Sequence, residues 1–254
     1  MIKQKPKMTN KANKRGQITI FIIIALALVS AISLFFIFRE RIFAPTEPLP
    51  PEAREIPKAI QECLEFNLVE GTILVGLQGG YTIPPDNAIE TNFSYISYGY
   101  YLGKNTLPLK EAIEKEISFY LENAMLFCIN LDQFPGIEIE LKNPKANTKI
   151  SPNSVKASLN FPIVLTKENS SSIIDEKYST EYKVRLYEFY NISQEIISKE
   201  IQNPELIEIS YLTNLNYDVS ILPYEGNTIV YTITNIKINE TENEYTFRFA
   251  NKLR

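Results

Sequence analysis

Two cysteines are the side chains of this sequence that are best suited by type to covalent chemistry. They are Cys63 and Cys128, and the chain has no others. An isolated pair forms a disulfide in an oxidising compartment and stays reduced in the cytosol. Closing a loop of about 65 residues would contribute on the order of 4 kcal/mol in the chain-entropy treatment. The pattern predicts one disulfide between them, and the alternative is two buried thiols.

Histidine, the commonest general base and zinc ligand, is absent from all 254 residues. Its absence excludes Ser-His-Asp triads, Cys-His pairs and His-based zinc sites. Acidic neighbours such as Asp175/Glu176 and Glu242/Glu244 have the pattern of solvated loops and strand faces. We therefore predict no catalytic residue, no metal ligand and no cofactor, and an enzyme is the least favoured class of function.

A segment rich in Gly, Pro and Tyr, residues 76–105, is the candidate contact site for a ligand or partner. Exposed tyrosines make good contacts at low entropic cost, and a structureless segment of this length is often functional. The alternative is a half-buried strand, or strand pair, that covers the neighbouring helices. The candidate contact residues are Tyr95, Tyr98, Tyr100 and Tyr101.

Four Asn-x-Ser/Thr sequences are candidate glycan acceptors if this part of the chain is exported. Because the pattern is short and the chain is rich in Asn, chance accounts for some of them. They are centred on Asn92, Asn169, Asn191 and Asn239.

A long apolar stretch near the N-terminus predicts how the residues above are placed relative to a membrane. Residues 18–38 are 21 consecutive residues without a charge, which as a helix would span roughly 30 Å, the thickness of a bilayer core. Residues 1–16 carry six basic side chains and no acidic one. The positive-inside rule then places residues 1–16 in the cytoplasm and the chain after Phe38 outside, as a single-pass anchor. A removable secretory signal is the alternative.

Charge and proline content characterise the chain beyond this basic segment. After residue 16 there are 20 basic and 30 acidic side chains, a net charge of −10, which argues against nucleic acid as a partner. We expect a basic cytoplasmic segment (1–16), a transmembrane helix (17–43), a Pro-rich linker (44–56), a helical disulfide-bridged region (57–135) and a β-rich region with an intervening helix (136–254).

Hydrophobic periodicity predicts an α+β ectodomain in which a helical pair packs on an antiparallel sheet. Helical spacing covers 57–75, 109–128 and 185–202, with Gly76, Gly79 and Gly80 ending the first helix. Each cysteine then lies on the apolar face of a helix. Alternating patterns predict strands at 137–141, 155–165, 173–184, 215–222, 228–236 and 244–250, with residues 169–172 as a turn.

The segment Lys14-Arg-Gly-Gln17 before the apolar stretch resembles the archaeal class III, type IV pilin-like signal. That resemblance implies cleavage between Gly16 and Gln17. Filament-forming members commonly carry Glu at the fifth mature position, where this sequence has Phe21. A buried terminal amine then lacks a partner, so we expect a monomeric anchor or minor subunit rather than the main filament protein.

The rest of the chain resembles a family of uncharacterised membrane-anchored proteins of small-genome archaea. The shared features are Cys63 before Gly-Leu-Gln-Gly-Gly-Tyr81, a helix ending in Cys128, and the closing Tyr-Thr-Phe-Arg-Phe-Ala250. That resemblance implies no known activity. The predicted anchor, the acidic domain beyond it, the class III-like signal and the absence of catalytic motifs together predict a structural or interaction protein of the envelope, with envelope or pilus-like proteins as partners. The alternative is an extracytoplasmic binding module that uses the tyrosine-rich segment.

Overall fold

The computed structural model describes residues 23–30, 32–33, 51–91, 94–168, 170–204, 206–235 and 243–253. The chain divides into two units, Met1–Glu47 and Pro48–Arg254. In the first unit, residues 23–30 are helical. Across the described residues, no helix has both the length and the apolar character that a membrane span requires. Much of the predicted span, residues 18–38, lies outside the described residues.

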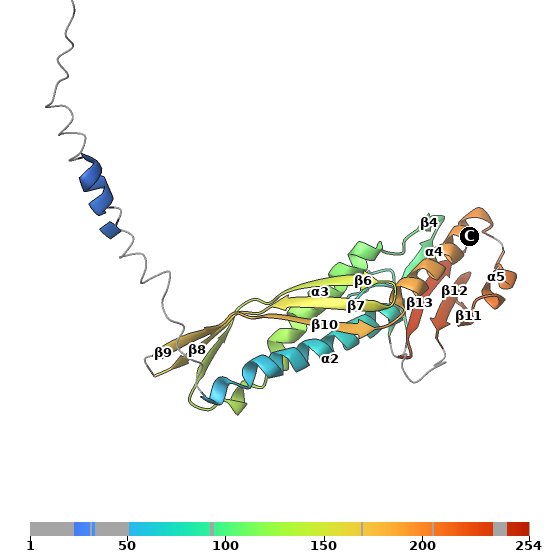
Figure 1. Cartoon of the computed structure of the whole chain (residues 1–254). Helices are drawn as coiled ribbons and strands as arrows, with labels where there is room; N and C mark the ends of the chain where they lie inside the picture. Colours follow the sequence, from blue (N-terminus) through green and yellow to red (C-terminus); the bar gives the residue numbers. More distant parts are fainter. Residues whose placement is uncertain are drawn as a thin grey trace, which may run out of the picture. The chain divides into compact units, whose positions relative to one another are not determined.

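Two antiparallel helices form the centre of the second unit. They are α2 (Ile56–Leu77) and α3 (Lys110–Cys128), and they lie beside strands β6, β7 and β10 in Figure 1. Pro57 suits the first turn of α2, because that position needs no amide donor. Gly79 and Gly80, both at positive φ, turn the chain after Leu77 as predicted. Gly76, also predicted to end the helix, lies within α2.

Each strand of a long antiparallel ribbon is interrupted at the same level. The ribbon consists of two three-stranded sheets, ordered β10-β7-β6 and β5-β8-β9. The chain passes between them at 142–144, at Phe161-Pro162 and at Asp175-Glu176. Proline has no amide to donate to a ladder, so Pro144 and Pro162 favour this break. The bounds are β5 (Glu138–Leu141), β6 (Lys145–Ser151), β7 (Ser154–Asn160), β8 (Ile163–Lys167), β9 (Ser170–Ile174) and β10 (Lys177–Lys183).

The third sheet lies at the other end of α2 and α3 (Figure 1). Its five strands are ordered β11-β12-β13-β3-β4, and only β13 and β3 are parallel. Its inner face packs against α4 (Leu186–Gln202) through stacked rings of Tyr231 and Phe249, whose centroids are 5.2 Å apart. The strands are β3 (Tyr98–Tyr101), β4 (Lys104–Asn105), β11 (Asp218–Tyr224), β12 (Thr228–Thr234) and β13 (Thr246–Lys252).

The remaining elements are short. A hairpin of β1 (Ile89–Glu90) and β2 (Tyr95–Ile96) covers part of the outer face of the five-stranded sheet, where Ile89 and Ile96 pack on Val230 and Ala250. The helix α5 (Ile209–Thr213) and the 3-10 turns η1 (Pro51–Ala53) and η2 (Leu131–Gln133) complete the set. One continuous core runs through α2, α3, α4 and the three larger sheets.

The α+β class is confirmed, and several details of the prediction are corrected. The expected strands 155–165 and 173–184 are each broken in two, and β6 was not predicted. Ser170–Ser172, expected to be a turn, begin β9. The segment 76–105 contains two hairpins, β1–β2 and β3–β4, so the alternative of paired strands is confirmed and the structureless loop is not. Because β3 pairs with β13, the expected regions 57–135 and 136–254 share a sheet.

Candidate functional site

The predicted disulfide is present. Cys63, near the start of α2, is bonded to Cys128, the last residue of α3, with Cα atoms 6.0 Å apart. That distance lies within the usual range for a bridge. Further along α2 the two helices touch again, where the ring of Tyr120 covers Gly71. The bridge therefore joins two helices that already pack closely.

The four candidate tyrosines do not share one surface. Tyr95 is exposed on β2, and Tyr98 and Tyr101 are half-buried on β3. Tyr100 is only 1% exposed and belongs to the core, which corrects its assignment as a contact residue. Regular alternation would place Tyr98 and Tyr100 on the same face, but the register of β3 against β13 shifts between these two residues. Because of this bulge Tyr100 faces the main core, whereas Tyr98 packs in the outer hydrophobic cluster.

A smaller aromatic surface remains on the outer side of the five-stranded sheet. The rings of Tyr98 and Tyr101 have centroids 4.8 Å apart and are tilted by 54°. The amine of Lys252 lies 5.8 Å from the centroid of the Tyr101 ring, within the range of a cation–π interaction. This arrangement offers aromatic faces and one positive charge to a ligand.

Other predicted positions lie mostly outside the described residues. These are Gly16, Gln17, Asn92, Asn169 and Asn239. Asn191 is described and exposed on α4. Two residues on, the buried hydroxyl of Ser193 donates to the carbonyl of Phe189 at 2.8 Å. That sequon is therefore helical and its hydroxyl is already engaged.

A buried carboxylate, Glu114, ties α3 to β6. It is 4% exposed and accepts hydrogen bonds from Lys110 Nζ (2.8 Å), Lys149 Nζ (3.0 Å) and the Ile150 amide (3.0 Å). Burial by itself raises the pKa of this carboxyl, but the three hydrogen bonds together outweigh burial and lower the pKa below its usual value. Glu114 thus stays ionised and acts as a structural link.

A second buried carboxylate, Glu200, ties α4 to the five-stranded sheet. It is 2% exposed and accepts hydrogen bonds from the Tyr231 hydroxyl and from Asn251 Nδ2. Burial raises the pKa of Glu200, and these two hydrogen bonds offset only part of the effect. Asn251 Oδ1 is buried and has no hydrogen-bond partner in the described part of the chain.

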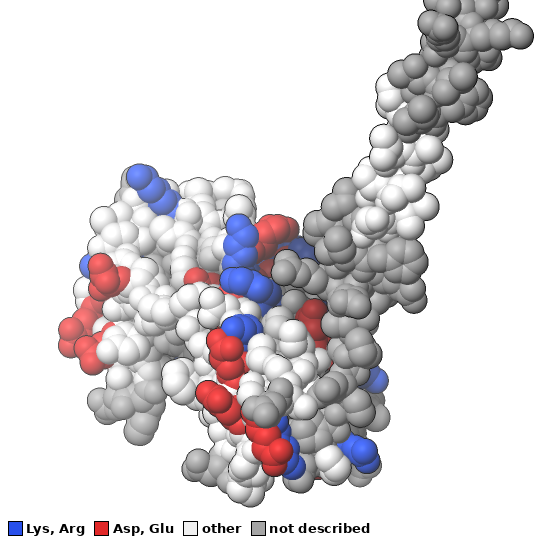
Figure 2. All heavy atoms as spheres, turned by 90° about the vertical axis from the view of Figure 1, so that its left-hand side faces the viewer, with Lys and Arg blue, Asp and Glu red and all other residues white. Residues whose placement is uncertain are grey.

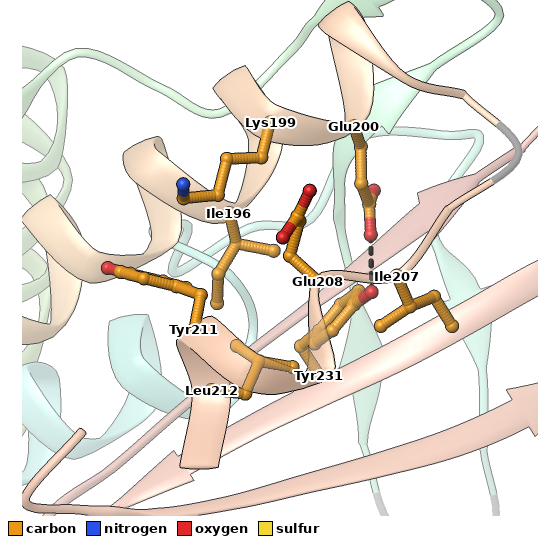
Figure 3. Close-up of a pocket in the computed structure, with 8 residues that line it drawn as sticks. All are labelled: Ile196, Lys199, Glu200, Ile207, Glu208, Tyr211, Leu212 and Tyr231. Atoms are coloured by element: carbon orange, nitrogen blue, oxygen red, sulfur yellow. Dashed lines mark hydrogen bonds between the residues drawn. The ribbon is translucent and has the colours of Figure 1, made fainter. Parts of the chain in front are cut away.

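The pocket beside Glu200 is small (Figure 3). Its cavity of about 10 Å³ has room for about one water molecule. Lys199, at its rim, lies 4.8 Å from the ring centroid of Tyr211, whose hydroxyl donates to Glu195 at 2.9 Å. Of the polar side chains that line this pocket, Glu200 and Tyr231 bond to each other. A cavity of this size holds no substrate, and its bonds link α4 to the five-stranded sheet. Its lining residues are Ile196, Lys199, Glu200, Ile207, Glu208, Tyr211, Leu212 and Tyr231.

The sequence contained a signal for both buried acids. Glu114 lies three residues before Ile117 and seven before Leu121, on the apolar face of α3, and Glu200 follows Ile196 and Ile197 at helical spacing. An acid at such a position cannot point to solvent while its neighbours are buried. A search for acidic residues close to one another in sequence does not find Glu114 or Glu200. What marks each of them is its helical spacing from buried apolar residues.

On the face shown in Figure 2, acidic and basic side chains lie next to one another through the centre, and a group of acidic side chains lies at the left edge. In the described part of the chain, no three His, Cys, Asp or Glu side chains are grouped as a metal site requires. No family model, curated protein or solved structure matches this chain.

Proposed function

We propose that the protein is a membrane-anchored structural or interaction protein of the cell surface, with its α+β domain outside the cell. The observation that carries this proposal is the disulfide between Cys63 and Cys128, because such bridges persist in oxidising compartments. The six basic residues before the apolar stretch 18–38 support the same orientation.

A rigid presenting domain suits this function. The bridge, the helical pair and the sheet β10-β7-β6 form one core, and the polar links at Glu114 and Glu200 fix the helices on the sheets. The resemblance to class III signals supports a pilin-like minor subunit as the more specific form of the proposal. Phe21 supports a minor rather than a main filament role.

A cysteine-accessibility experiment tests the location. Intact cells producing the chain, with a tag after Arg254, are treated with external protease and then analysed without reductant. We expect the tag to be lost and the thiols to resist maleimide until reductant is added. A tag placed before Lys3 is the control and should survive. A protected C-terminal tag together with free thiols would overturn the proposal.

N-terminal sequencing tests the pilin-like form separately. We expect the membrane-bound chain to begin at Gln17, and a Gly16→Val variant to keep its basic segment. An intact Met1 or Ile2 terminus in the unmodified chain would exclude processing while leaving the proposed location untouched. Filaments made mainly of this chain would contradict the minor role.

The pair Tyr98 and Tyr101, with Lys252 beside it, favours a second candidate function, an extracytoplasmic binding module. Binding of a panel of oligosaccharides to the full chain tests it. Tyr101→Ala should abolish binding, whereas Tyr224→Ala, on the same sheet, should not. A Tyr101→Ala variant that still binds would dismiss this surface.

A further inference from the structure

The outer face of the sheet β10-β7-β6 carries its side chains in regular rows. One row contains Lys145, Asn160 and Lys177; the next contains Asn147, Ser158 and Ser179; the third contains Lys149, Lys156 and Glu181. Successive rows lie about 7 Å apart on one face of a sheet, so the two lysine rows are roughly 13 Å apart. Short amide and hydroxyl side chains therefore lie between long basic ones.

This alternation of length makes a trough. A shallow open hollow of about 530 Å³ lies over Asn147, Ser158 and Ser179, and the lysines of the third row border it. The lysine side chains remain accessible: Lys145 is 74%, Lys149 64% and Lys156 58% exposed. A ligand lying in the hollow could thus reach hydroxyl and amide groups on its floor and the amines of Lys149 and Lys156 at one end, and an extended ligand would continue over the first row, with Lys145 and Lys177.

The net charge of the trough is positive although the chain beyond residue 16 is acidic. The three rows hold four lysines and one acid, Glu181, which lies 3.7 Å from Lys156. From α3, Glu114 faces Lys149 but is shared with Lys110, and Glu122 lies 3.9 Å from Lys145. Lys177 is exposed on β10.

We infer that this trough binds an acidic polysaccharide. Lysine amines complement carboxylate or sulfate groups, and a floor of hydroxyls and an amide complements sugar hydroxyls, which take both donors and acceptors. The trough is open and its floor is made of short side chains, as an extended polymer requires. This inference rests on the proposed location outside the cell, where such polymers occur, and names a partner for the proposed interaction role.

Binding of the full chain in detergent to immobilised polymers tests the inference. The probes are polygalacturonate for carboxylates, dextran sulfate for sulfates, and neutral dextran as the uncharged control. We expect binding to at least one charged polymer, weakening as salt rises, and none to neutral dextran. The charged polymer that binds identifies the anionic group. Failure to bind either charged polymer at low salt would overturn the inference.

Two variants separate the trough from general basicity. Lys156→Ser with Lys177→Ser should weaken binding about tenfold, since each removes an exposed charge contact. The matched control, Lys58→Ser with Lys115→Ser on exposed helix positions, should change binding less than about twofold. Equal losses in both double variants would mean that no specific site exists.

A third variant tests shape without changing charge. Ser158→Tyr fills the floor and suits an exposed strand position, so it should abolish polysaccharide binding while thermal unfolding stays unchanged. Undiminished binding by Ser158→Tyr, or equal binding to poly-glutamate, would show attraction by charge alone and overturn the inference. The protease experiment on cells reports the location of the domain independently. A failure of the proposed location can therefore be distinguished from a failure of polysaccharide binding.

Discussion

The backbone of α2 at Gly76 approaches β13 so closely that a Cβ on Gly76 would lie 2.4 Å from the carbonyl oxygen of Thr246. It would also lie 2.6 Å from the hydroxyl of Tyr245, which is buried and donates to the carbonyl of Thr72 at 3.0 Å. This approach is how the central helix docks on the five-stranded sheet.

Gly76→Ala should therefore destabilise the fold by about 1–3 kcal/mol, because backbone cannot move aside as a flexible side chain can. Gly71→Ala on the same helix is the matched control. There the nearest atom belongs to the Tyr120 ring, 2.7 Å away, and helix propensity gains about 1 kcal/mol. Urea unfolding followed by tyrosine fluorescence measures both, as the chain has no Trp. Equal effects would mean that Gly76 does not set the contact.

Removing the bridge with Cys63→Ser and Cys128→Ser should lower the free energy of unfolding by about 4 kcal/mol, following loop-closure entropy. The same unfolding experiment measures it with and without reductant. Reductant should destabilise the unmodified chain to the level of the double variant and leave the double variant unaffected. A reductant effect on the double variant would point to another cause.

Glu114→Gln should lower stability at pH 7 by about 1–3 kcal/mol, because charge-assisted hydrogen bonds are lost. The folded pKa of Glu114 lies below its unfolded value, so its stabilisation is present above the unfolded pKa and is lost as the pH falls through the folded pKa. The difference in free energy of unfolding between the Glu114→Gln variant and the unmodified chain should therefore become smaller at acidic pH. Glu122→Gln, the more exposed acid on the same helix, should cost less than about 0.5 kcal/mol.

Glu200→Gln should have the opposite pH dependence. The folded pKa of Glu200 is raised, so its favourable contribution is present below the unfolded pKa and is lost as the pH rises through the folded pKa. A permanently neutral Gln lacks this loss, so the stability of the variant relative to the unmodified chain should rise as the pH increases above the unfolded pKa of Glu200. Glu195→Gln, exposed on the same helix, is the control. Parallel curves for Glu200→Gln would contradict the raised pKa.

Local patterns predicted the parts of the fold that depend on local physics. The apolar faces of 57–75 and 109–128 placed Cys63 and Cys128 toward one another, and the bridge follows from that register. The alternation in β12 and β13 likewise reflects one face of the sheet packed on the main core. These elements could be predicted because the apolar spacing within each segment matches the face that the segment buries.

The missed elements depend on partners distant in sequence. The inward residues of β6 include Ala146 and Thr148, so the strand shows no clear apolar alternation. Two of its backbone amides donate to side chains of α3, namely Ser118 and Glu114. The pairing of β3 with β13 joins residues about 150 apart and leaves Tyr100 in the core. A hydrophobic pattern read along one segment contains no information on such contacts.

The bridge also determines where tension would pass through the chain. A pull applied between the two ends enters at the N-terminal side of α2 and reaches Cys63 after about two turns of helix. The covalent bond then transfers the force directly to Cys128. Residues 64–127, which include most of both helices and strands β1–β4, form a closed loop that carries no extension. When the domain is stretched, any increase in its length therefore comes only from the unfolding of segments outside that loop.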